Sequence, residues 1–124
     1  MKKFILGRFK AICYSITGAL HLIKTENAIQ AQLFFSLCFV VAGFYFEISK
    51  IEWMFQILAI GMILFSEALN TAIEKISDFI HPDYNKKIGL IKDISAGSVF
   101  FSVVFGLIVA LLIYYPKISL FILF

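Results

Sequence analysis

Charged residues are scarce in this sequence. They make up 15% of its 124 residues, whereas 61% are hydrophobic and fifteen are phenylalanine. With a mean hydropathy of +0.95, this composition excludes an ordinary soluble domain and favours a chain that lies in lipid. We therefore expect residues 1–124 to form a single membrane-embedded domain. The net charge of +3 suggests an anionic partner only weakly, and we expect no nucleic acid.

Cysteine is also scarce, and known nucleotide-binding fingerprints are missing. Cys13 and Cys38 lie far apart without a CxxC spacing, which argues against a disulfide framework or a zinc site. The sequence contains no GxxxxGK[ST], HRD or GxGxxG run. Its N-terminus begins like a secretory signal, but Arg8 and Lys10 interrupt the apolar run and no A-x-A site follows. We therefore expect no cleaved signal peptide.

The first segment, residues 4–25, is expected to be an amphipathic helix on the membrane surface. Its apolar residues recur at spacings of three and four, and basic or polar residues occupy much of the rest. The apolar positions are Ile5, Phe9, Ile12, Ile16, Leu20 and Ile23. Packing of this helix on a soluble core is the weaker alternative, because the remainder of the chain is so apolar.

Three further segments are long and apolar enough to cross the bilayer, which takes about 20 residues. These expected spans are residues 28–48, 53–80 and 94–115. A polar loop over 81–91 should separate the last two, with Asp93 as a cap of the third span and Pro116 at its end. The predicted fold class is an all-α membrane protein with an N-terminal surface helix and three transmembrane helices.

The distribution of lysine and arginine predicts the orientation of these helices. Five lie in the N-terminal segment and four in residues 75–92, which together are nine of the eleven basic residues. Lys50 and Lys117 fall on the other side. The N-terminus and the second loop should therefore face the cytoplasm in the cytoplasmic membrane.

A polar stripe ends the otherwise apolar second span. Glu67, Asn70, Thr71, Glu74 and Asp78 fall within an arc of roughly 100° on a helix. Carboxylates are costly in lipid, so such residues usually face a bundle interior or a watery cavity and act there. The stripe is therefore the first candidate site, although ion paths and proton relays also use buried carboxylates.

The ends of three helices should meet at this side of the membrane. Glu26 precedes the first span, and Lys92 lies at the start of the third. Carboxylates at a wet surface suit Mg²⁺ bound with phosphates, for which Glu26 and Glu74 are the best candidates, and Lys92 can neutralise a phosphate. Glu67 lies about 10 Å deeper, where a desolvated carboxylate is a plausible general base for a hydroxyl. This arrangement predicts phosphoryl transfer to a membrane alcohol.

Simpler interpretations compete at several positions. Glu67 and Glu74 could be structural partners of lysines, and Asp78 could be a solvated residue at a helix end. Lys92 could be an anchor whose ammonium reaches the membrane surface. Asp93 could be a helix cap, a nucleotide contact or both. Tyr14 and Tyr84 could be interfacial aromatic residues.

Two motifs resemble the prokaryotic diacylglycerol kinase family, which includes undecaprenol kinases. They are ExxNxAIExxxD over residues 67–78 and KDxxAG over residues 92–97. The resemblance extends over nearly the whole chain. It implies an ATP-dependent lipid kinase, with Mg²⁺, that forms a homotrimer of three-span subunits with active sites shared between neighbours.

The resemblance also implies roles for single residues. Glu67 would accept the proton of the lipid hydroxyl, Asn70 would support the catalytic geometry, and Glu26 and Glu74 would hold the metal of the ATP complex. Arg8 resembles an N-terminal arginine of the family and would contact the lipid. The implied nucleotide contacts are Tyr14, Glu26, Glu74, Asp83, Tyr84, Asn85, Lys92 and Asp93.

Two functions of different classes therefore follow. The first is a kinase that converts diacylglycerol to phosphatidic acid or undecaprenol to undecaprenyl phosphate, and the two motifs are somewhat closer to the undecaprenol-kinase branch. The second is a non-catalytic transport or scaffold protein with the carboxylates as an ion path. The expected clustering of polar groups at one surface, which leaves the outer halves of the spans apolar, disfavours the second.

Overall fold

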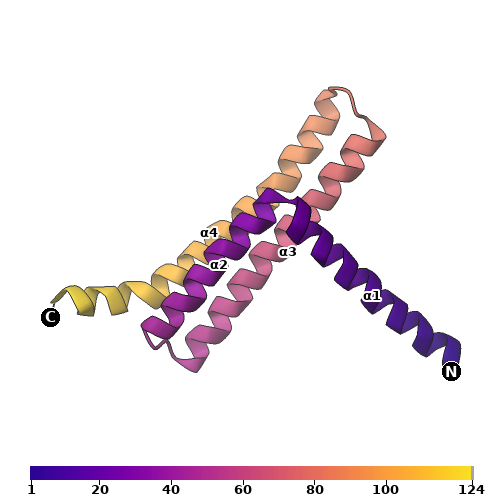
Figure 1. The fold of residues 1–124 in the computed structure, drawn as a ribbon. Helices are drawn as coiled ribbons and strands as arrows, with labels where there is room; N and C mark the ends of the chain where they lie inside the picture. Colours follow the sequence, from indigo (N-terminus) through magenta and orange to yellow (C-terminus); the bar gives the residue numbers. More distant parts are fainter. Residues whose placement is uncertain (124) are drawn as a thin grey trace.

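A computed structural model describes residues 1–123 as four helices joined by short connections (Figure 1). The helices are α1 (Lys2–Thr25), α2 (Asn27–Tyr45), α3 (Lys50–Ile80) and α4 (Lys86–Leu123). Three of them, α2, α3 and α4, are long and apolar enough to cross a membrane, and the described residues contain no strand. The predicted all-α class, with an N-terminal helix before three spans, is confirmed.

The N-terminus of α3 is fixed by a reciprocal cap. The Ser49 hydroxyl accepts a hydrogen bond from the Glu52 backbone N–H at 3.3 Å, and the Glu52 carboxylate accepts one from the Ser49 N–H at 2.6 Å. This capping box satisfies two donors that a helix start leaves open. It starts α3 at Lys50, three residues before the predicted start at Trp53.

The start of α4 differs from the prediction. Asn85 accepts hydrogen bonds through its side-chain oxygen from the backbone N–H groups of Lys87, at 2.9 Å, and Ile88, at 3.3 Å. Asparagine is a strong N-cap, so the helix begins at Lys86 and the polar loop shrinks to residues 81–85. Asp93 therefore lies in the second turn of α4, and its predicted role as a helix cap is wrong.

The predicted helix end at Pro116 is also wrong, because α4 continues through this residue to Leu123. Proline removes one backbone donor and favours a kink, but a helix already formed can continue beyond it. The Ser119 hydroxyl donates to the Pro116 carbonyl at 2.9 Å. The last turns of α4 bend away from the bundle (Figure 1).

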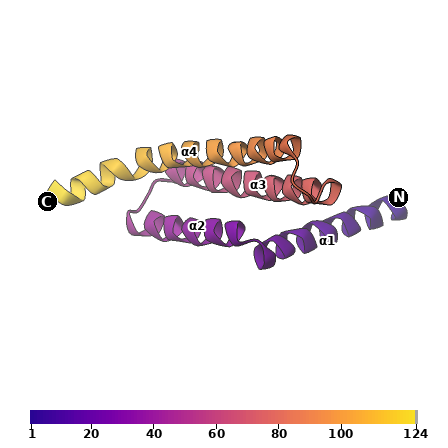
Figure 2. The same ribbon diagram turned by 90° about the horizontal axis from the view of Figure 1, so that it is seen from above.

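Helices α3 and α4 form a long antiparallel hairpin, and α3 lies between α4 and α2 (Figure 2). Two contacts between the helices are Asp78–Lys92 and Gln56–Tyr114. The number of residues between the two contacts is the same on α3 as on α4, so the register of the helices is constant along the hairpin. At about 46 Å for its 31 residues, α3 exceeds the ~30 Å hydrocarbon core. An upright α3 would therefore extend beyond the hydrocarbon core.

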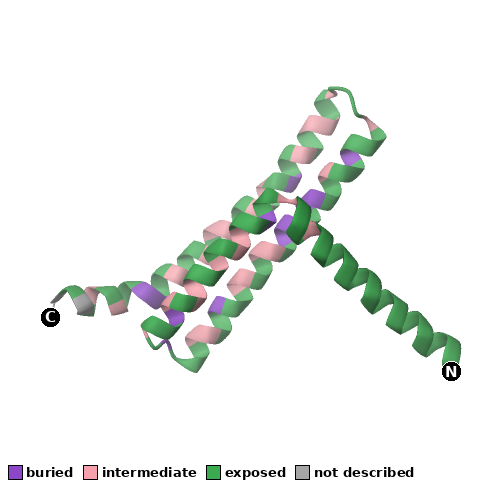
Figure 3. Ribbon diagram, viewed as in Figure 1, coloured by how far each residue is buried: buried purple, intermediate pink, exposed green. Residues whose placement is uncertain are grey.

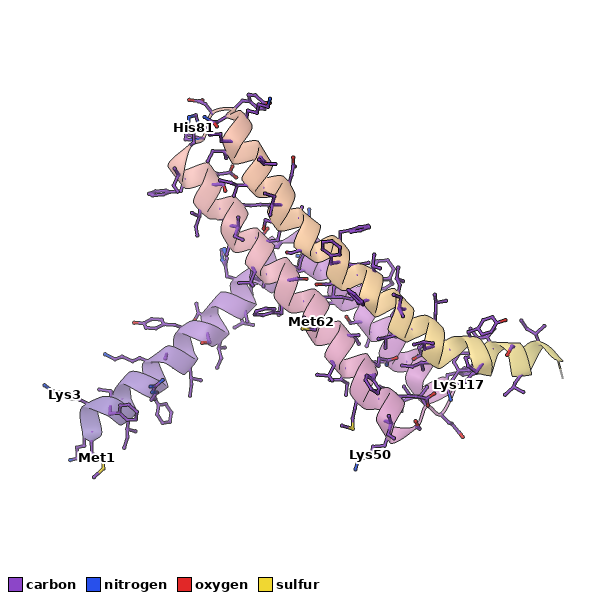
Figure 4. All side chains as sticks on the ribbon, turned by 180° about the vertical axis from the view of Figure 1, so that it is seen from behind. Met1, Lys3, Lys50, Met62, His81 and Lys117 are labelled. Carbon is purple, nitrogen blue, oxygen red and sulfur yellow. The ribbon has the colours of Figure 1, made fainter. Side chains whose placement is uncertain are left out.

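Helix α1 leaves the bundle at its junction with α2 and buries none of its residues against the rest of the chain (Figure 3). Much of the outer surface of the three spans is likewise exposed and apolar. In a membrane that surface faces lipid or other protein chains. His81 lies at one end of the hairpin, and Lys50 and Lys117 lie at the other (Figure 4).

The end of the bundle opposite His81 contains a polar network that the sequence did not indicate. The Tyr114 hydroxyl lies 2.6 Å from the Gln56 side-chain oxygen and 3.0 Å from the Phe39 carbonyl. The Gln56 amide donates to the same carbonyl at 3.1 Å. Gln56 and Tyr114 are only 4% and 7% exposed. The expectation that the outer halves of the spans are wholly apolar is therefore wrong.

This network predicts a measurable loss of stability in Tyr114→Phe. The substitution removes the hydroxyl that joins α4 to both α2 and α3, and it leaves the Gln56 oxygen buried without that donor. Hydrogen bonds between membrane helices contribute about 0.6 kcal/mol on average and up to about 1.7 kcal/mol, so we expect a loss of about 1 kcal/mol in denaturant unfolding in detergent. Tyr115→Phe is the matched control, because Tyr115 is 71% exposed. Equal stability of the two variants would contradict the prediction.

Candidate active site

The polar stripe of α3 faces the interior of the bundle. Glu67 and Asn70 are each 7% exposed and Thr71 is 5% exposed. Glu74 is half-buried, and Asp78 is exposed near the end of the helix. The stripe therefore runs from a buried end at Glu67 to an exposed end at Asp78, near the end of α3.

Glu67 is the deepest carboxylate of the stripe. Within residues 1–123 no hydrogen bond or ion pair holds it. Glu74, two turns away, lies within Coulombic range of it. A buried carboxylate is costly unless it is paired, so structural pairing with a lysine does not explain Glu67.

Asn70 lies between Glu67 and Glu74 along α3 and bonds to Glu74. Its amide nitrogen donates to the Glu74 carboxylate at 3.2 Å. Its side-chain oxygen is buried and has no partner within the described residues. Asn70 thus orients Glu74 and leaves one acceptor unused inside the bundle.

Ser95, on the facing helix, is a polar residue that sequence reasoning missed. It is 5% exposed, and its hydroxyl has no hydrogen-bond partner among the described residues. Several other hydroxyls in the described helices donate to a carbonyl of their own helix: Ser15, Thr17, Thr25, Ser36, Ser66, Ser98, Ser102 and Ser119. Ser95 does not, so the α3–α4 interface holds a second unused polar atom. Its place within the KDxxAG motif was the available signal.

Glu26 lies at the one-residue break between α1 and α2, where its backbone is extended. Its carboxylate accepts hydrogen bonds from Lys75, at 2.9 Å, and from the Thr25 hydroxyl, at 3.0 Å. Both bonds lower the pKa of the Glu26 carboxyl, and the bond from Lys75 has the larger effect on it. The group is therefore ionised at neutral pH. The pairing also brings Glu26 beside the stripe of α3, as expected, while the role of Lys75 was missed.

A second ion pair joins the stripe to α4. The Lys92 ammonium lies 2.9 Å from the Asp78 carboxylate, and Glu74 is within Coulombic range of the same ammonium. Glu26, Glu74, Asp78 and Lys92 therefore lie at the same end of the three spans. That juxtaposition is the geometric condition on which the kinase hypothesis depended.

The connection between α3 and α4 lies just beyond this cluster. Tyr84 is 92% exposed. The His81 ring nitrogen Nδ1 donates to the Asp83 carbonyl at 3.0 Å, which shapes the turn. The Asn85 side chain is occupied with capping α4. Asp93 is exposed on α4 one residue after Lys92.

Two predicted site residues lie apart from the cluster within this chain. Arg8 and Tyr14 are both exposed on α1, which points away from the bundle. Counted along the helix from Glu26, they are about 27 Å and about 18 Å away. The Arg8 guanidinium instead lies 5.0 Å from the centre of the Phe4 ring.

The carboxylates suit a magnesium ion that is bound together with phosphates. Among residues 1–123 no three His, Cys, Asp or Glu side chains converge as a complete cage. Mg²⁺ does not need one, because it usually takes one or two carboxylates and keeps waters and phosphate oxygens as further ligands. The Lys75 ammonium lies 2.9 Å from Glu26, so this carboxylate already pairs with a cation. The oxygen donors of Glu26 and Glu74 are of the chemical type that a magnesium ion with waters and phosphate oxygens accepts.

An apolar cavity of about 310 Å³ lies between α2, α3 and α4. Its lining includes Ile63, one helical turn before Glu67, together with Val103 and Gly106 of α4. The only long polar side chains in the lining are Gln32 and Gln56. The cavity therefore leads from the neighbourhood of Glu67 into the apolar part of the bundle.

Comparison with known proteins identifies the family of the chain. The family model described as prokaryotic diacylglycerol kinase matches residues 13–114. The chain is 35% identical over 109 residues to the undecaprenol kinase of Bacillus subtilis, which covers 88% of this chain and 89% of that protein. It is 29% identical over 87 residues to the diacylglycerol kinase of Haemophilus influenzae, covering 70% of this chain and 74% of that protein.

These matches decide between an enzyme and a non-catalytic transport or scaffold protein. The family match begins within α1 at residue 13, ends at residue 114 and includes both motifs, and the relatives are named as an undecaprenol kinase and a diacylglycerol kinase. The chain belongs to the prokaryotic diacylglycerol kinase family and is a membrane-embedded lipid kinase.

Proposed function

We propose that the protein transfers the γ-phosphate of ATP to the hydroxyl of undecaprenol, with Mg²⁺ as the metal. The observation that carries this proposal is Glu67, a residue only 7% exposed whose carboxylate has no hydrogen-bond or ion-pair partner within the described residues. It lies between an apolar cavity and a carboxylate–lysine cluster that faces water. A lipid hydroxyl can approach from the first side and a nucleotide from the second.

Glu67 is the proposed general base. It would take the hydroxyl proton as the lipid oxygen attacks the γ-phosphorus, while the bond from that phosphorus to the leaving ADP oxygen breaks. Asn70 positions Glu74 through the hydrogen bond described above. Phosphoryl transfer depends mainly on such positioning and on charge stabilisation.

Glu26 and Glu74 are the proposed metal ligands. They would hold a divalent ion together with the triphosphate, and that ion would supply neutralisation of the charge on the phosphate oxygens. Lys92 would approach the phosphates from α4, and Asp93 and the 83–85 connection would contact the rest of the nucleotide. Their position at the water-facing end of the hairpin supports this assignment.

The active unit is proposed to be a homotrimer in which neighbouring chains complete each site. Arg8 and Tyr14 cannot reach the cluster of their own chain, because α1 points away from it (Figure 1). The apolar faces of the spans are also widely exposed in the single chain. A neighbouring copy would cover part of this surface and could receive α1 beside its own nucleotide site.

The orientation follows from charge and from the position of the cluster. We propose that the N-terminus and the α3–α4 connection face the cytoplasm of the inner membrane, where ATP is available. Nine of the eleven lysines and arginines belong to that side. The length of α3 beyond the hydrocarbon core would bring Glu74 and Asp78 to the membrane surface.

The proposed substrate is a polyprenol rather than diacylglycerol. The relative named undecaprenol kinase is more similar in sequence and matches more of the chain than the relative named diacylglycerol kinase. The apolar cavity beside Ile63 would take the hydrocarbon nearest the hydroxyl. The hydrocarbon chains of undecaprenol and of diacylglycerol both suit an apolar lining, so the lining does not discriminate between these substrates. An assay that offers both lipids does.

The test is a competition assay with the purified protein in detergent micelles. γ-Labelled ATP and Mg²⁺ are supplied with equal amounts of undecaprenol and diacylglycerol, and the labelled lipids are separated by chromatography. We expect label chiefly in undecaprenyl phosphate. Label chiefly in phosphatidic acid would reverse the substrate assignment, and no labelled lipid from either alcohol would refute the proposed activity.

A further inference from the structure

Lys75 stands out because it occupies part of the proposed metal site. Its ammonium lies 2.9 Å from the Glu26 carboxylate. It also follows Glu74, the second proposed ligand, directly in sequence. The Lys75 ammonium, a monovalent cation, is thus paired with a carboxylate that is proposed to bind a divalent cation.

The ion pair is accessible and easily displaced. The side chains of Lys75 and Glu26 are 57% and 23% exposed. Ion pairs in water are weak, because solvent screens the charges and two side chains must be held in place. The lysine ammonium is a mobile point charge on a flexible four-carbon stem, so it can leave Glu26 without movement of α3.

The charges at the site require a cation in the metal-free protein. The Glu26 carboxylate pairs with Lys75 at 2.9 Å and lies beside a helix that also presents Glu74 and Asp78. Asp78 has Lys92 as its partner at 2.9 Å, and Lys75 serves Glu26 in the same way. A divalent ion on Glu26 would repel the ammonium, whose nearest new anions would be the phosphates bound to that ion.

We propose that Lys75 is the resident counter-ion of Glu26 in the metal-free state, and that the metal–nucleotide complex displaces it so that its ammonium pairs with the phosphates. Lys75 is then a positioning residue with two successive partners. The inference rests on the proposed function for the identity of the ligands, Mg²⁺ and ATP. It predicts that Lys75 weakens the binding of Mg²⁺, with which it competes for Glu26, and strengthens the binding of ATP, whose phosphates it attracts.

The experiment measures binding rather than turnover. Mn²⁺ is titrated into the purified full-length protein and free Mn²⁺ is followed by electron paramagnetic resonance. ATP binding is then measured by equilibrium dialysis at saturating Mn²⁺, without lipid substrate. In Lys75→Gln we expect the Kd for Mn²⁺ to fall about two- to fivefold and the Kd for ATP to rise about two- to fivefold, the range expected of one exposed ion pair.

Two further variants separate this role from a general charge effect. Lys75→Arg keeps the charge and should bind both ligands like the wild type. Lys24→Gln removes a lysine two residues from Glu26 that makes no ion pair among the described residues, and both Kd values should remain unchanged. A fall in the Kd for Mn²⁺ in Lys24→Gln as large as that in Lys75→Gln would overturn the proposal.

The failure of this proposal is distinguishable from failure of the proposed function. An unchanged Kd for either ligand in Lys75→Gln would overturn the displacement of Lys75, even in a chain that phosphorylates lipid normally. Absence of lipid phosphorylation in the wild type would refute the proposed activity, while the binding constants would still report on Lys75.

Discussion

Replacing Glu67 by Gln is expected to lower the turnover number about 10²–10⁴-fold, the usual contribution of a positioned general base. Glutamine has nearly the same shape and can fill the same buried space, but it cannot take the hydroxyl proton. Because the wild-type carboxylate has no partner to lose within residues 1–123, the substitution should not destabilise the bundle. Turnover is measured with γ-labelled ATP and undecaprenol under single-turnover conditions.

The control for this prediction is the binding of the other reactants. Glu67→Gln should bind Mn²⁺ and ATP like the wild type, since Glu67 lies about two helical turns from Glu74. Its denaturant midpoint should be equal to or above that of the wild type, because an unpaired buried carboxylate is replaced by a neutral amide. A variant with normal turnover would remove Glu67 from the role of base.

Replacing Glu74 by Gln should raise the Mg²⁺ concentration for half-maximal activity by at least about tenfold. Loss of a residue that merely supports a metal ligand already costs about 10–100-fold in metal affinity or activity, and Glu74 is proposed as a ligand itself. The amide keeps the side-chain oxygen that accepts from Asn70 at 3.2 Å, so the local hydrogen bond can persist. The measurement is a Mg²⁺ titration of activity at saturating ATP.

Glu47→Gln is the matched control for this variant. Glu47 is an exposed carboxylate in the connection between α2 and α3, at the opposite end of the bundle from Glu74. Its removal lowers the negative charge of the protein by the same amount and should leave the Mg²⁺ dependence unchanged. If Glu74→Gln and Glu47→Gln required the same Mg²⁺ concentration, Glu74 would not be a metal ligand.

The helices could be predicted more accurately than their ends. A run of apolar residues long enough to span lipid identifies a helix without reference to its neighbours, because only internal hydrogen bonds can satisfy the backbone there. The ends depend on single residues such as caps and prolines. Asn85 caps α4, which begins at Lys86, eight residues before the expected start at residue 94. Helix α4 also continues through Pro116, where the sequence predicted its end.

The part of the candidate site that lies on one helix could be predicted, whereas the part that depends on a second helix could not. Glu67, Asn70 and Glu74 share a helix face because the helical period fixes their spacing, and the structure places that face inside the bundle. Ser95 was missed because a serine in an apolar helix commonly bonds to its own backbone. Its unused hydroxyl is apparent only when α3 lies opposite it.

The three spans, the polar face of α3 and the family can be recognised from the sequence, since each depends on the order of residues within one segment or motif. Contacts between charged and polar groups of different helices are seen only in the folded chain: Lys75 with Glu26, Lys92 with Asp78, and Tyr114 with Gln56. These partners are separated along the chain, and their contact depends on the rotation and register of packed helices, which the helical period of one segment does not specify.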